Sequence, residues 1–306
     1  MYRIFKQRGS GSFGRNGCFN DRCSCSIVFT VALISFSLLS STFAFGKSKN
    51  EVSTWCCYYG QQDKTEDLAR FDLAVLDAGG QKPEQLRKRR VKCLVYVSLG
   101  EVHTDSPYYA QAAKLGLLVR YNENWDSWVV DIRRPEWKKM LFEQIIPDAL
   151  KSGYDGLFFD TLDSPIDMQR QDPDTYKGTE RSCVELIKDI RNHYPKLFLC
   201  QNRGFEIIQR TAPYIDYLLI EGLSSSMDIA TGIRSDVSDQ DREFLITKAQ
   251  SAIKKNRNLV VLSLDYALPD DKQEIDKAYK FSRKQGFVPY VSTPELHQVN
   301  TYAPAP

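Results

Sequence analysis

Histidine is scarce in this chain of 306 residues, which contains only His103, His193 and His297. The three lie far apart, and none of their spacings is one that metal ligands use, so a zinc hydrolase or a metal-dependent deacetylase is disfavoured and no metal is expected. The sequence also lacks a G-x-S-x-G motif, which leaves a serine hydrolase of that type without support. No pattern indicates a nucleotide, so we expect no cofactor.

An excess of one charge is also absent, because 41 basic residues face 39 acidic ones and the net charge is +2. With this balance the protein has no overall positive electrostatic potential that would attract nucleic acid, and we expect no nucleic-acid partner. Hydrophobic residues make up 42% of the chain and charged residues 26%. These values are typical of a globular protein and exclude disorder, collagen-like repeats and coiled coil as the main description.

Cysteine is present, but not in a pattern that identifies a site. The eight cysteines include no C-x-x-C pair, and three of them lie in the first 25 residues. The remaining five are Cys56, Cys57, Cys93, Cys183 and Cys200. A disulfide such as Cys57 with Cys93 is one interpretation, and small buried hydrophobic side chains are the other.

The first 46 residues are typical of an export signal. An apolar run at residues 27–45 ends in the small-x-small pattern Thr42-Phe-Ala44, and basic residues precede it: Arg3, Lys6, Arg8, Arg15 and Arg22. We therefore predict a secretory signal segment over residues 1–46, cleaved near Ala44 to Gly46, and a secreted or periplasmic protein. An uncleaved anchor is the alternative, since the run is about long enough to cross a bilayer, but its serines make a permanent membrane span unexpected.

From Trp55 onward, short β-branched or aromatic runs alternate with longer helical patterns. Strands are predicted at residues 55–59, 72–79, 92–100, 156–160, 197–201, 217–221, 259–265 and 287–292. Helices are predicted at residues 83–90, 135–151, 178–193, 205–212, 239–255 and 270–285. Several strands are apolar throughout, as buried parallel strands are. The pattern predicts an α/β fold, a single-domain (β/α)8 TIM barrel over residues 47–306, with a doubly wound open sheet as the alternative.

Three segments between and after these elements carry separate expectations. Residues 128–131 can form a ninth strand, but we interpret them as part of the long connection after the third strand. Residues 163–178 are expected to be a loop that helps to form a substrate groove, and residues 293–306 a loose tail. Trp125, Trp128 and Trp137 can stack on sugar rings or pack in the core, and Trp137 is expected in the core.

Acidic residues follow five of the predicted strands at the carboxyl end, where the loops of a barrel surround one mouth. These acids are Asp77, Glu101, Asp160 with Asp163 just beyond, Glu221 and Asp265. Neighbouring polar or aromatic positions are Tyr59, His103, Asn202, Arg203 and Tyr266. Except for Asp160 and Glu221, we assign these residues to substrate binding. The alternative is structural, since carboxylates at strand ends often cap helices or bind backbone amides.

A ring of carboxylates without metal-binding histidines suits glycoside hydrolysis. One carboxyl group must stay protonated to help the leaving oxygen depart, and another must be ionised to attack the sugar or activate water. Asp160 and Glu221 form the best pair, because both follow strongly apolar strands and 61 residues separate them, two strand–helix units. Alternate strands of a barrel point side chains toward the same layer, so the two can face each other.

Five motifs in a fixed order carry a resemblance to a known family. They are YVSLGEV (residues 96–102), WVVDIRRPEW (128–137), SGYDGLFFDTLD (152–163), NRGFE (202–206) and LLIEGL (218–223). This set resembles glycoside hydrolase family 114, and in particular its bacterial branch, which includes the hydrolase domain of the Pel polysaccharide-processing protein. The resemblance extends over about residues 55–292.

The resemblance implies a (β/α)8 barrel and endo-acting hydrolysis of α-1,4-linked galactosamine or N-acetylgalactosamine polymers. It places the two catalytic carboxylates on Asp160 as nucleophile and Glu221 as general acid/base, which implies a retaining mechanism. Asp77, Glu101 and Asp265 would then line an acidic cleft suited to a cationic amino-sugar polysaccharide. Two alternatives remain: a non-catalytic carbohydrate-binding barrel, and a glycosidase for a different glycan.

Overall fold

The computed structural model describes residues 52–227 and 233–303. The predicted export signal at residues 1–46 lies outside the described residues and stays a prediction. Within the described ranges, no helix combines the length and the apolar character that a membrane crossing requires.

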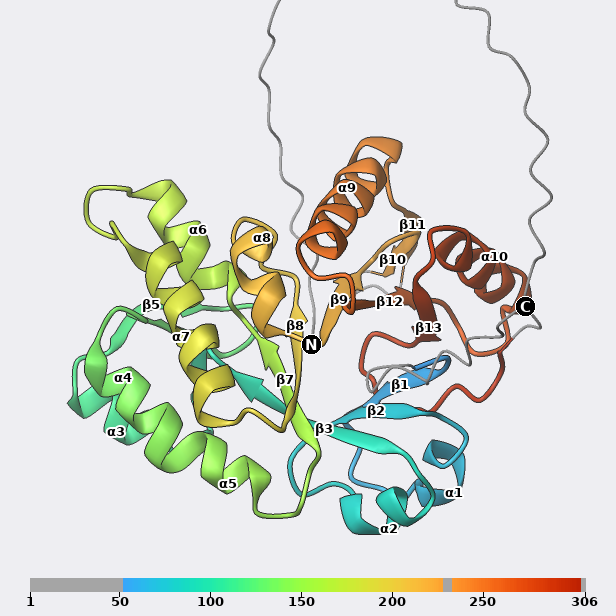
Figure 1. Cartoon of the computed structure of the whole chain (residues 1–306), viewed down its shortest axis with the longest axis horizontal. Helices are drawn as coiled ribbons and strands as arrows, with labels where there is room; N and C mark the ends of the chain where they lie inside the picture. Colours follow the sequence, from blue (N-terminus) through green and yellow to red (C-terminus); the bar gives the residue numbers. More distant parts are fainter. Residues whose placement is uncertain (1–51, 228–232, 304–306) are drawn as a thin grey trace, which may run out of the picture. The chain divides into compact units, whose positions relative to one another are not determined.

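Eight parallel strands form one sheet that curls into a nearly closed barrel, with helices between successive strands (Figure 1). The strands, in spatial order, are β1 (Trp55–Tyr58), β2 (Leu73–Leu76), β3 (Lys92–Ser98), β7 (Gly156–Asp160), β8 (Phe198–Asn202), β9 (Tyr217–Glu221), β12 (Val260–Tyr266) and β13 (Val288–Ser292). Spatial order equals chain order, as a barrel requires and a doubly wound sheet does not. The predicted TIM-barrel class and all eight predicted strands are confirmed.

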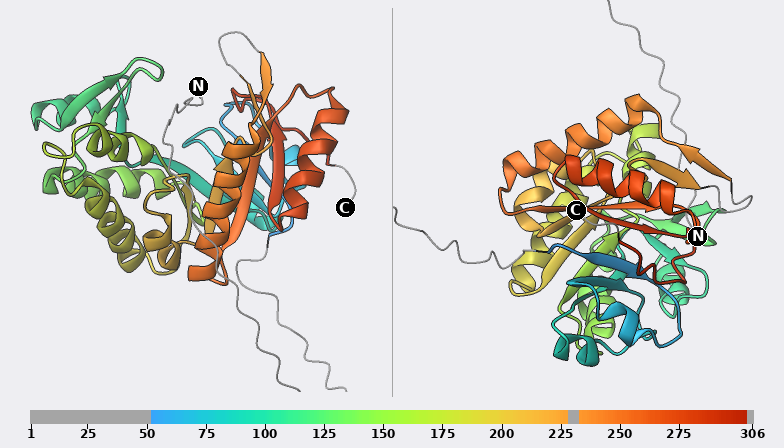
Figure 2. Two further views of the ribbon diagram at one scale, coloured as in Figure 1. Left: turned by 90° about the horizontal axis from the view of Figure 1, so that it is seen from above. Right: turned by 90° about the vertical axis from the view of Figure 1, so that its right-hand side faces the viewer.

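Helices lie outside the strands, and the two longest end in charges that suit the helix dipole (Figure 2). They are α1 (Thr65–Leu68), α2 (Pro83–Lys88), α3 (Tyr109–Lys114), α4 (Pro135–Met140), the π-helical η1 (Leu141–Ile145), α5 (Ile146–Leu150), α6 (Asp163–Gln171), α7 (Thr179–His193), α8 (Ile208–Thr211), the 3-10 helix η2 (Ala212–Tyr214), α9 (Asp239–Lys255) and α10 (Lys272–Lys284). The predicted helix at 135–151 is α4, η1 and α5 in succession. Residues 163–178 are not simply a loop, because α6 occupies their first half.

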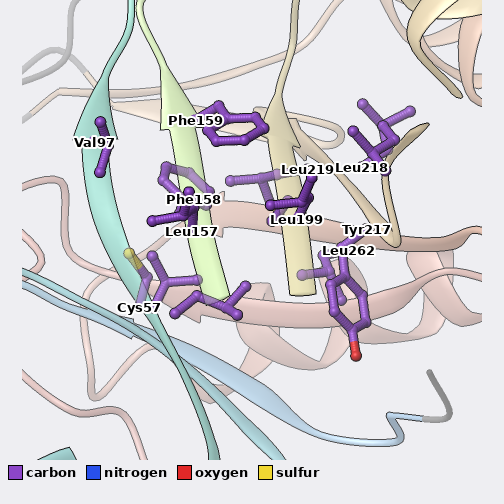
Figure 3. Close-up of a cluster of buried hydrophobic side chains, with 14 of the residues drawn as sticks. Cys57, Val97, Leu157, Phe158, Phe159, Leu199, Tyr217, Leu218, Leu219 and Leu262 are labelled. Atoms are coloured by element: carbon purple, nitrogen blue, oxygen red, sulfur yellow. The ribbon is translucent and has the colours of Figure 1, made fainter. Parts of the chain in front are cut away.

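Alternate residues of each strand face the barrel interior and the surrounding helices. Phe158, Cys200 and Tyr217 are in register on β7, β8 and β9 and form part of an interior layer. Leu157 and Leu199 are in register on the other face, toward the helices. All five side chains are buried, and Figure 3 shows several members of both layers. Burial on both faces explains why these strands are apolar throughout.

The cysteines of the described chain are buried free thiols. Cys57 is in register with Val75 of β2, and Val75 with Leu94 of β3, so Cys57 and Leu94 share a face. Cys93, the neighbour of Leu94, therefore points to the opposite side of the sheet. This is why the possible Cys57–Cys93 disulfide does not form.

The first and last strands, β1 and β13, meet at a seam closed by side chains and by the C-terminal segment. Trp55 Nε1 donates to the carbonyl of Val288 at 2.8 Å. The N–H of Tyr59 donates to the carbonyl of Leu296 at 2.8 Å, and the Leu296 side chain is only 2% exposed. Asn300 and Tyr302 also hydrogen-bond to the barrel, so the prediction of a loose tail from residue 293 is wrong as far as residue 302. The edge of β1 binds this backbone, and the core takes up its apolar side chain.

Two smaller antiparallel sheets extend from the carboxyl ends of the barrel strands. The first, in the connection after β3, contains β4 (Glu101–His103), β6 (Ser127–Val130) and β5 (Leu118–Asn122). Residues 128–131 thus belong to that connection, as predicted, but residues 128–130 are a strand of this sheet. The second, after β9, pairs β10 (Ser225–Met227) with β11 (Arg234–Asp236).

Candidate active site

Asp160, Asn202 and Glu221 end three neighbouring strands, β7, β8 and β9, and their side chains meet. Asn202 Nδ2 donates to Asp160 Oδ1 at 3.0 Å and lies 3.5 Å from Glu221 Oε2. Each of the three residues is at most 5% exposed. The structure therefore brings together the two carboxylates that the sequence pairs, with one amide between them.

Each carboxylate also has a tyrosine partner. The Tyr266 hydroxyl donates to Glu221 Oε1, and the Tyr96 hydroxyl is a hydrogen-bond partner of Asp160. The ring of Tyr59 packs edge-on against Tyr96, with centroids 5.5 Å apart. Sequence reasoning assigned Tyr59 and Tyr266 to this site but missed Tyr96. The period of two along β3 could have found it, because Tyr96 is in register with the interior Phe158.

The pKa of Glu221 is raised above its ordinary value. Burial is the main cause, and the nearby charge of Asp160 acts in the same direction. The Tyr266 hydroxyl, the Arg203 guanidinium and the Asn202 amide oppose the shift without cancelling it. Glu221 therefore keeps its proton to a higher pH than an exposed glutamate does, as a general acid must.

The residue after each of these three side chains has a left-handed backbone. Their φ angles are +65° at Thr161, +50° at Arg203 and +68° at Gly222. Glycine adopts such angles freely, whereas a β-branched residue such as Thr161 rarely does. The chain thus turns sharply immediately after Asp160, Asn202 and Glu221, at the carboxyl ends of their strands.

Arg203 and Asp163 form a support next to the pair. Arg203 Nε donates to Asp163 Oδ2 at 3.1 Å, and its Nη1 lies 3.4 Å from the carbonyl of Glu221. The N–H of Gly204 donates to Asp163 Oδ1 at 3.0 Å. Asp163, predicted to bind substrate, therefore joins the turn after β8 to the start of α6.

Two other predicted subsite acids are engaged by the protein itself. Asp265 Oδ1 accepts the N–H groups of Ser224 and Ser225 at 2.7 and 3.0 Å, and it lies beside Tyr266 on β12, so the two side chains face opposite sides of the sheet. The Glu101 carboxylate accepts the hydroxyls of Ser127 and Ser164. In this structure, Asp265 and Glu101 hold loops at the barrel mouth.

Asp77 and His103 have different surroundings. Asp77, at the end of β2, is partly exposed, and Gln61 Nε2 lies 3.5 Å from its Oδ2. Burial raises its pKa, and its charge acts on Tyr96, which places it near the tyrosine that binds Asp160. His103 is exposed, and its Nδ1 accepts the N–H of Asp105 at 3.1 Å, as in an ordinary surface turn.

Comparison with solved structures finds similar barrels. The glycoside hydrolase domain of PelA from Pseudomonas aeruginosa is 28% identical, with a TM-score of 0.72 over 81% of this chain and 98% of that one. Ega3 from Aspergillus fumigatus, solved in complex with galactosamine, has a TM-score of 0.59 at 13% identity, over 82% of this chain and 93% of that one. The likeness to Ega3 shows the shared fold alone.

A search of curated proteins gave no match. The family model for glycoside-hydrolase family GH114, in contrast, matches residues 40–305. That match covers the barrel strands, the paired carboxylates and all five motifs found in the sequence. The chain therefore belongs to glycoside hydrolase family 114 and is a glycoside hydrolase that acts on polysaccharide.

Proposed function

We propose that this protein is a secreted, endo-acting, retaining hydrolase of α-1,4-linked galactosamine and N-acetylgalactosamine exopolysaccharide. The observation that carries the proposal is the position of Asn202, whose amide nitrogen contacts both carboxylates. Two carboxyl groups held beside one another at a barrel mouth are the machinery that glycoside hydrolysis needs.

The same contacts support retention of configuration. Asp160 Oδ1 and Glu221 Oε2 lie 3.0 and 3.5 Å from one nitrogen, so the sum of these distances, 6.5 Å, is the most that can separate the two oxygens. Retaining glycosidases keep their carboxyl groups about 5–5.5 Å apart, whereas inverting enzymes leave about 6.5–9.5 Å for a water molecule. Because these two oxygens are at most 6.5 Å apart, at the lower limit of the inverting range, their separation favours direct attack by a carboxylate on the sugar.

The surroundings support a division of roles. Glu221, with its raised pKa, donates its proton to the leaving glycosidic oxygen while a carboxylate oxygen of Asp160 bonds to the anomeric carbon. Water then attacks that carbon from the side of Glu221, which takes the proton of the water as the bond to Asp160 breaks. Asn202 donates to Asp160 and keeps its carboxylate turned toward Glu221.

Two observations support an amino-sugar substrate: the acidic residues at the barrel mouth and the galactosamine bound to Ega3. Besides burial, the charges of Asp160, Glu101 and Asp77 raise the pKa of the Tyr96 hydroxyl, so several carboxylates lie near this part of the barrel mouth. A polymer that carries ammonium groups complements such a surface. Ega3, of the same fold, was solved with galactosamine, and we extend that ligand class to this chain.

We further propose that residues 1–46 direct export, since an exopolysaccharide is met outside the cytoplasm. A basic stretch, an apolar run and a small-x-small pattern support this proposal. The amino-terminal sequence of the mature protein, read after expression in a bacterial host with its export pathway, tests it. A start near residue 47 is expected, and an intact amino terminus would contradict cleavage.

Digestion of a defined polymer tests the activity. Residues 47–306 are incubated with partly deacetylated α-1,4-galactosaminan, and mass spectrometry follows new reducing ends. Oligosaccharides are expected from the wild type. Asp160→Asn is expected to be inactive, and Glu221→Gln to be slower by about 100- to 10,000-fold, both with an unchanged thermal midpoint.

Asp189→Asn is the matched control, because it removes the same charge from an exposed ion pair with Lys138 and is expected to remain active. Binding of the polymer without products would indicate a carbohydrate-binding barrel. Products from another glycan alone would keep the hydrolase and reject the substrate.

A further inference from the structure

Thr161, which follows Asp160, has a backbone that its side chain disfavours. Its φ of +65° lies in the left-handed region, where a β-branched residue is strained by about 1–3 kcal/mol. Such a conformation persists only when neighbouring groups hold it in place. This angle turns the chain immediately after Asp160, the last residue of β7.

The hydroxyl of Thr161 is held by the turn that follows β3. Thr161 Oγ1 lies 2.7 Å from Ser98 Oγ and accepts the N–H of Gly100 at 2.9 Å. In the same turn, the N–H of Leu99 donates to the carbonyl of Asp160 at 3.0 Å. Residues 98–101, here called the SLGE turn, thus bind both Asp160 and Thr161.

The SLGE turn is itself fixed from its other side. Trp137 Nε1 donates to the carbonyl of Leu99 at 2.8 Å, and the N–H of Val130 donates to the carbonyl of Gly100 at 2.9 Å. The carboxylate of Glu101 binds Ser164, at the start of α6. Three of the sequence motifs, at residues 96–102, 128–137 and 152–163, therefore contact one another here. These contacts fix the SLGE turn, so it can hold Thr161 in place.

Space is equally restricted. A Cβ atom on Gly100 would lie 2.3 Å from the carbonyl oxygen of Thr161 and 2.8 Å from Cδ of Pro165. Only glycine lets the SLGE turn approach the backbone after Asp160 this closely. Hydrogen bonds and close packing from the SLGE turn thus both restrain the backbone of Asp160 and Thr161.

We propose that Thr161 is a positioning residue for Asp160: its hydroxyl, bound to the SLGE turn, holds the left-handed turn that aims the Asp160 carboxylate at the sugar. The proposal rests on the proposed function, in which Asp160 is the nucleophile. A displacement of about 1 Å in a reacting group can cost about 100-fold in rate, so the hydroxyl affects turnover although it lies behind the carboxylate.

Thr161→Val and Thr161→Ser separate this role from general stability. Valine keeps the β-branched shape without the hydroxyl, and it is expected to lower kcat on α-1,4-galactosaminan by about 10- to 100-fold with KM unchanged. Serine restores the hydroxyl and is expected to remain within about threefold of wild-type kcat. Ser98→Ala removes one partner of the hydroxyl and leaves the Gly100 N–H in place, so it is expected to lower kcat in the same direction as valine but by less.

Thr54→Val is the matched control at the opposite end of the strands. Its hydroxyl also accepts an N–H, that of Asp72 at 3.0 Å. Thr54→Val is therefore expected to lower the thermal midpoint about as much as Thr161→Val does, while kcat stays at the wild-type value. The proposal is overturned if Thr161→Val and Ser98→Ala keep wild-type kcat, or if Thr161→Ser loses as much as valine. Asp160→Asn is measured in parallel, because activity in that variant would reject the proposed nucleophile and not only its positioning.

Discussion

At the scale of single residues, the two carboxylates share Asn202, and each has its own tyrosine partner. Glu221 is buried and accepts the Tyr266 hydroxyl, and its pKa is raised because burial outweighs this hydrogen bond. Asp160 has the Asn202 amide and the Tyr96 hydroxyl beside it. Its raised pKa suits Glu221 to the acid role, which leaves the nucleophile role of the proposed mechanism to Asp160.

Tyr266→Phe is expected to move the alkaline limb of the kcat/KM profile to higher pH. The hydroxyl favours the ionised form of Glu221 and so lowers its pKa; without it, Glu221 holds its proton to a still higher pH. Tyr217→Phe is the control, since its buried hydroxyl has no hydrogen-bond partner within the described residues. A limb that moves to lower pH in Tyr266→Phe, or equally in both variants, would contradict the role given to Glu221.

Sequence patterns predicted that Asp160 and Glu221 lie together, but they did not separate neighbours that face the barrel interior from those that face outward. Asp265 and Tyr266 are adjacent on β12, so only one of them can face the interior, and the structure shows that it is Tyr266. Thr161 could not be predicted at all, because its importance arises from a backbone angle and a distant turn.

At the scale of elements, the abrupt turns after β7, β8 and β9 place the site, and the SLGE turn supports the first of them. The barrel strands and the longer helices were predictable because apolar runs and caps are local signals, whereas the short helices α1 and α3 were not predicted. The helix α6 was missed because most of residues 163–171 are polar and the apolar signal is weak. The separate sheet of β4, β5 and β6 was missed because β4 has only three residues and pairs with β6 across the intervening α3 and β5.

Gly100→Ala is expected to destabilise the protein by about 1–3 kcal/mol and to lower kcat, because the new methyl group pushes against the backbone of Thr161. Gly286→Ala is the matched control: its φ is +78° with open space around it, so it is expected to cost about 1 kcal/mol without loss of kcat. Urea denaturation and kcat on the polymer give the two quantities. Full activity in Gly100→Ala would show that the turn does not aim Asp160.

At the scale of the whole molecule, the barrel follows from eight buried strands and the length of the connections between them. Its closure was less predictable, because the seam between β1 and β13 depends on Trp55 and on the C-terminal segment around Leu296. Nothing in the local sequence of that segment indicates a partner. The fold nevertheless makes the proposed chemistry specific, because it holds Asp160 and Glu221 beside one amide, as the proposed retaining mechanism requires.

The anomeric configuration of the first product tests that claim most directly. Proton NMR of early digests of α-1,4-galactosaminan separates α from β reducing ends before mutarotation mixes them. The close approach of Asp160 and Glu221 through Asn202 predicts that the α anomer forms first. A β anomer formed first would mean that water attacks directly, and it would contradict Asp160 as the nucleophile.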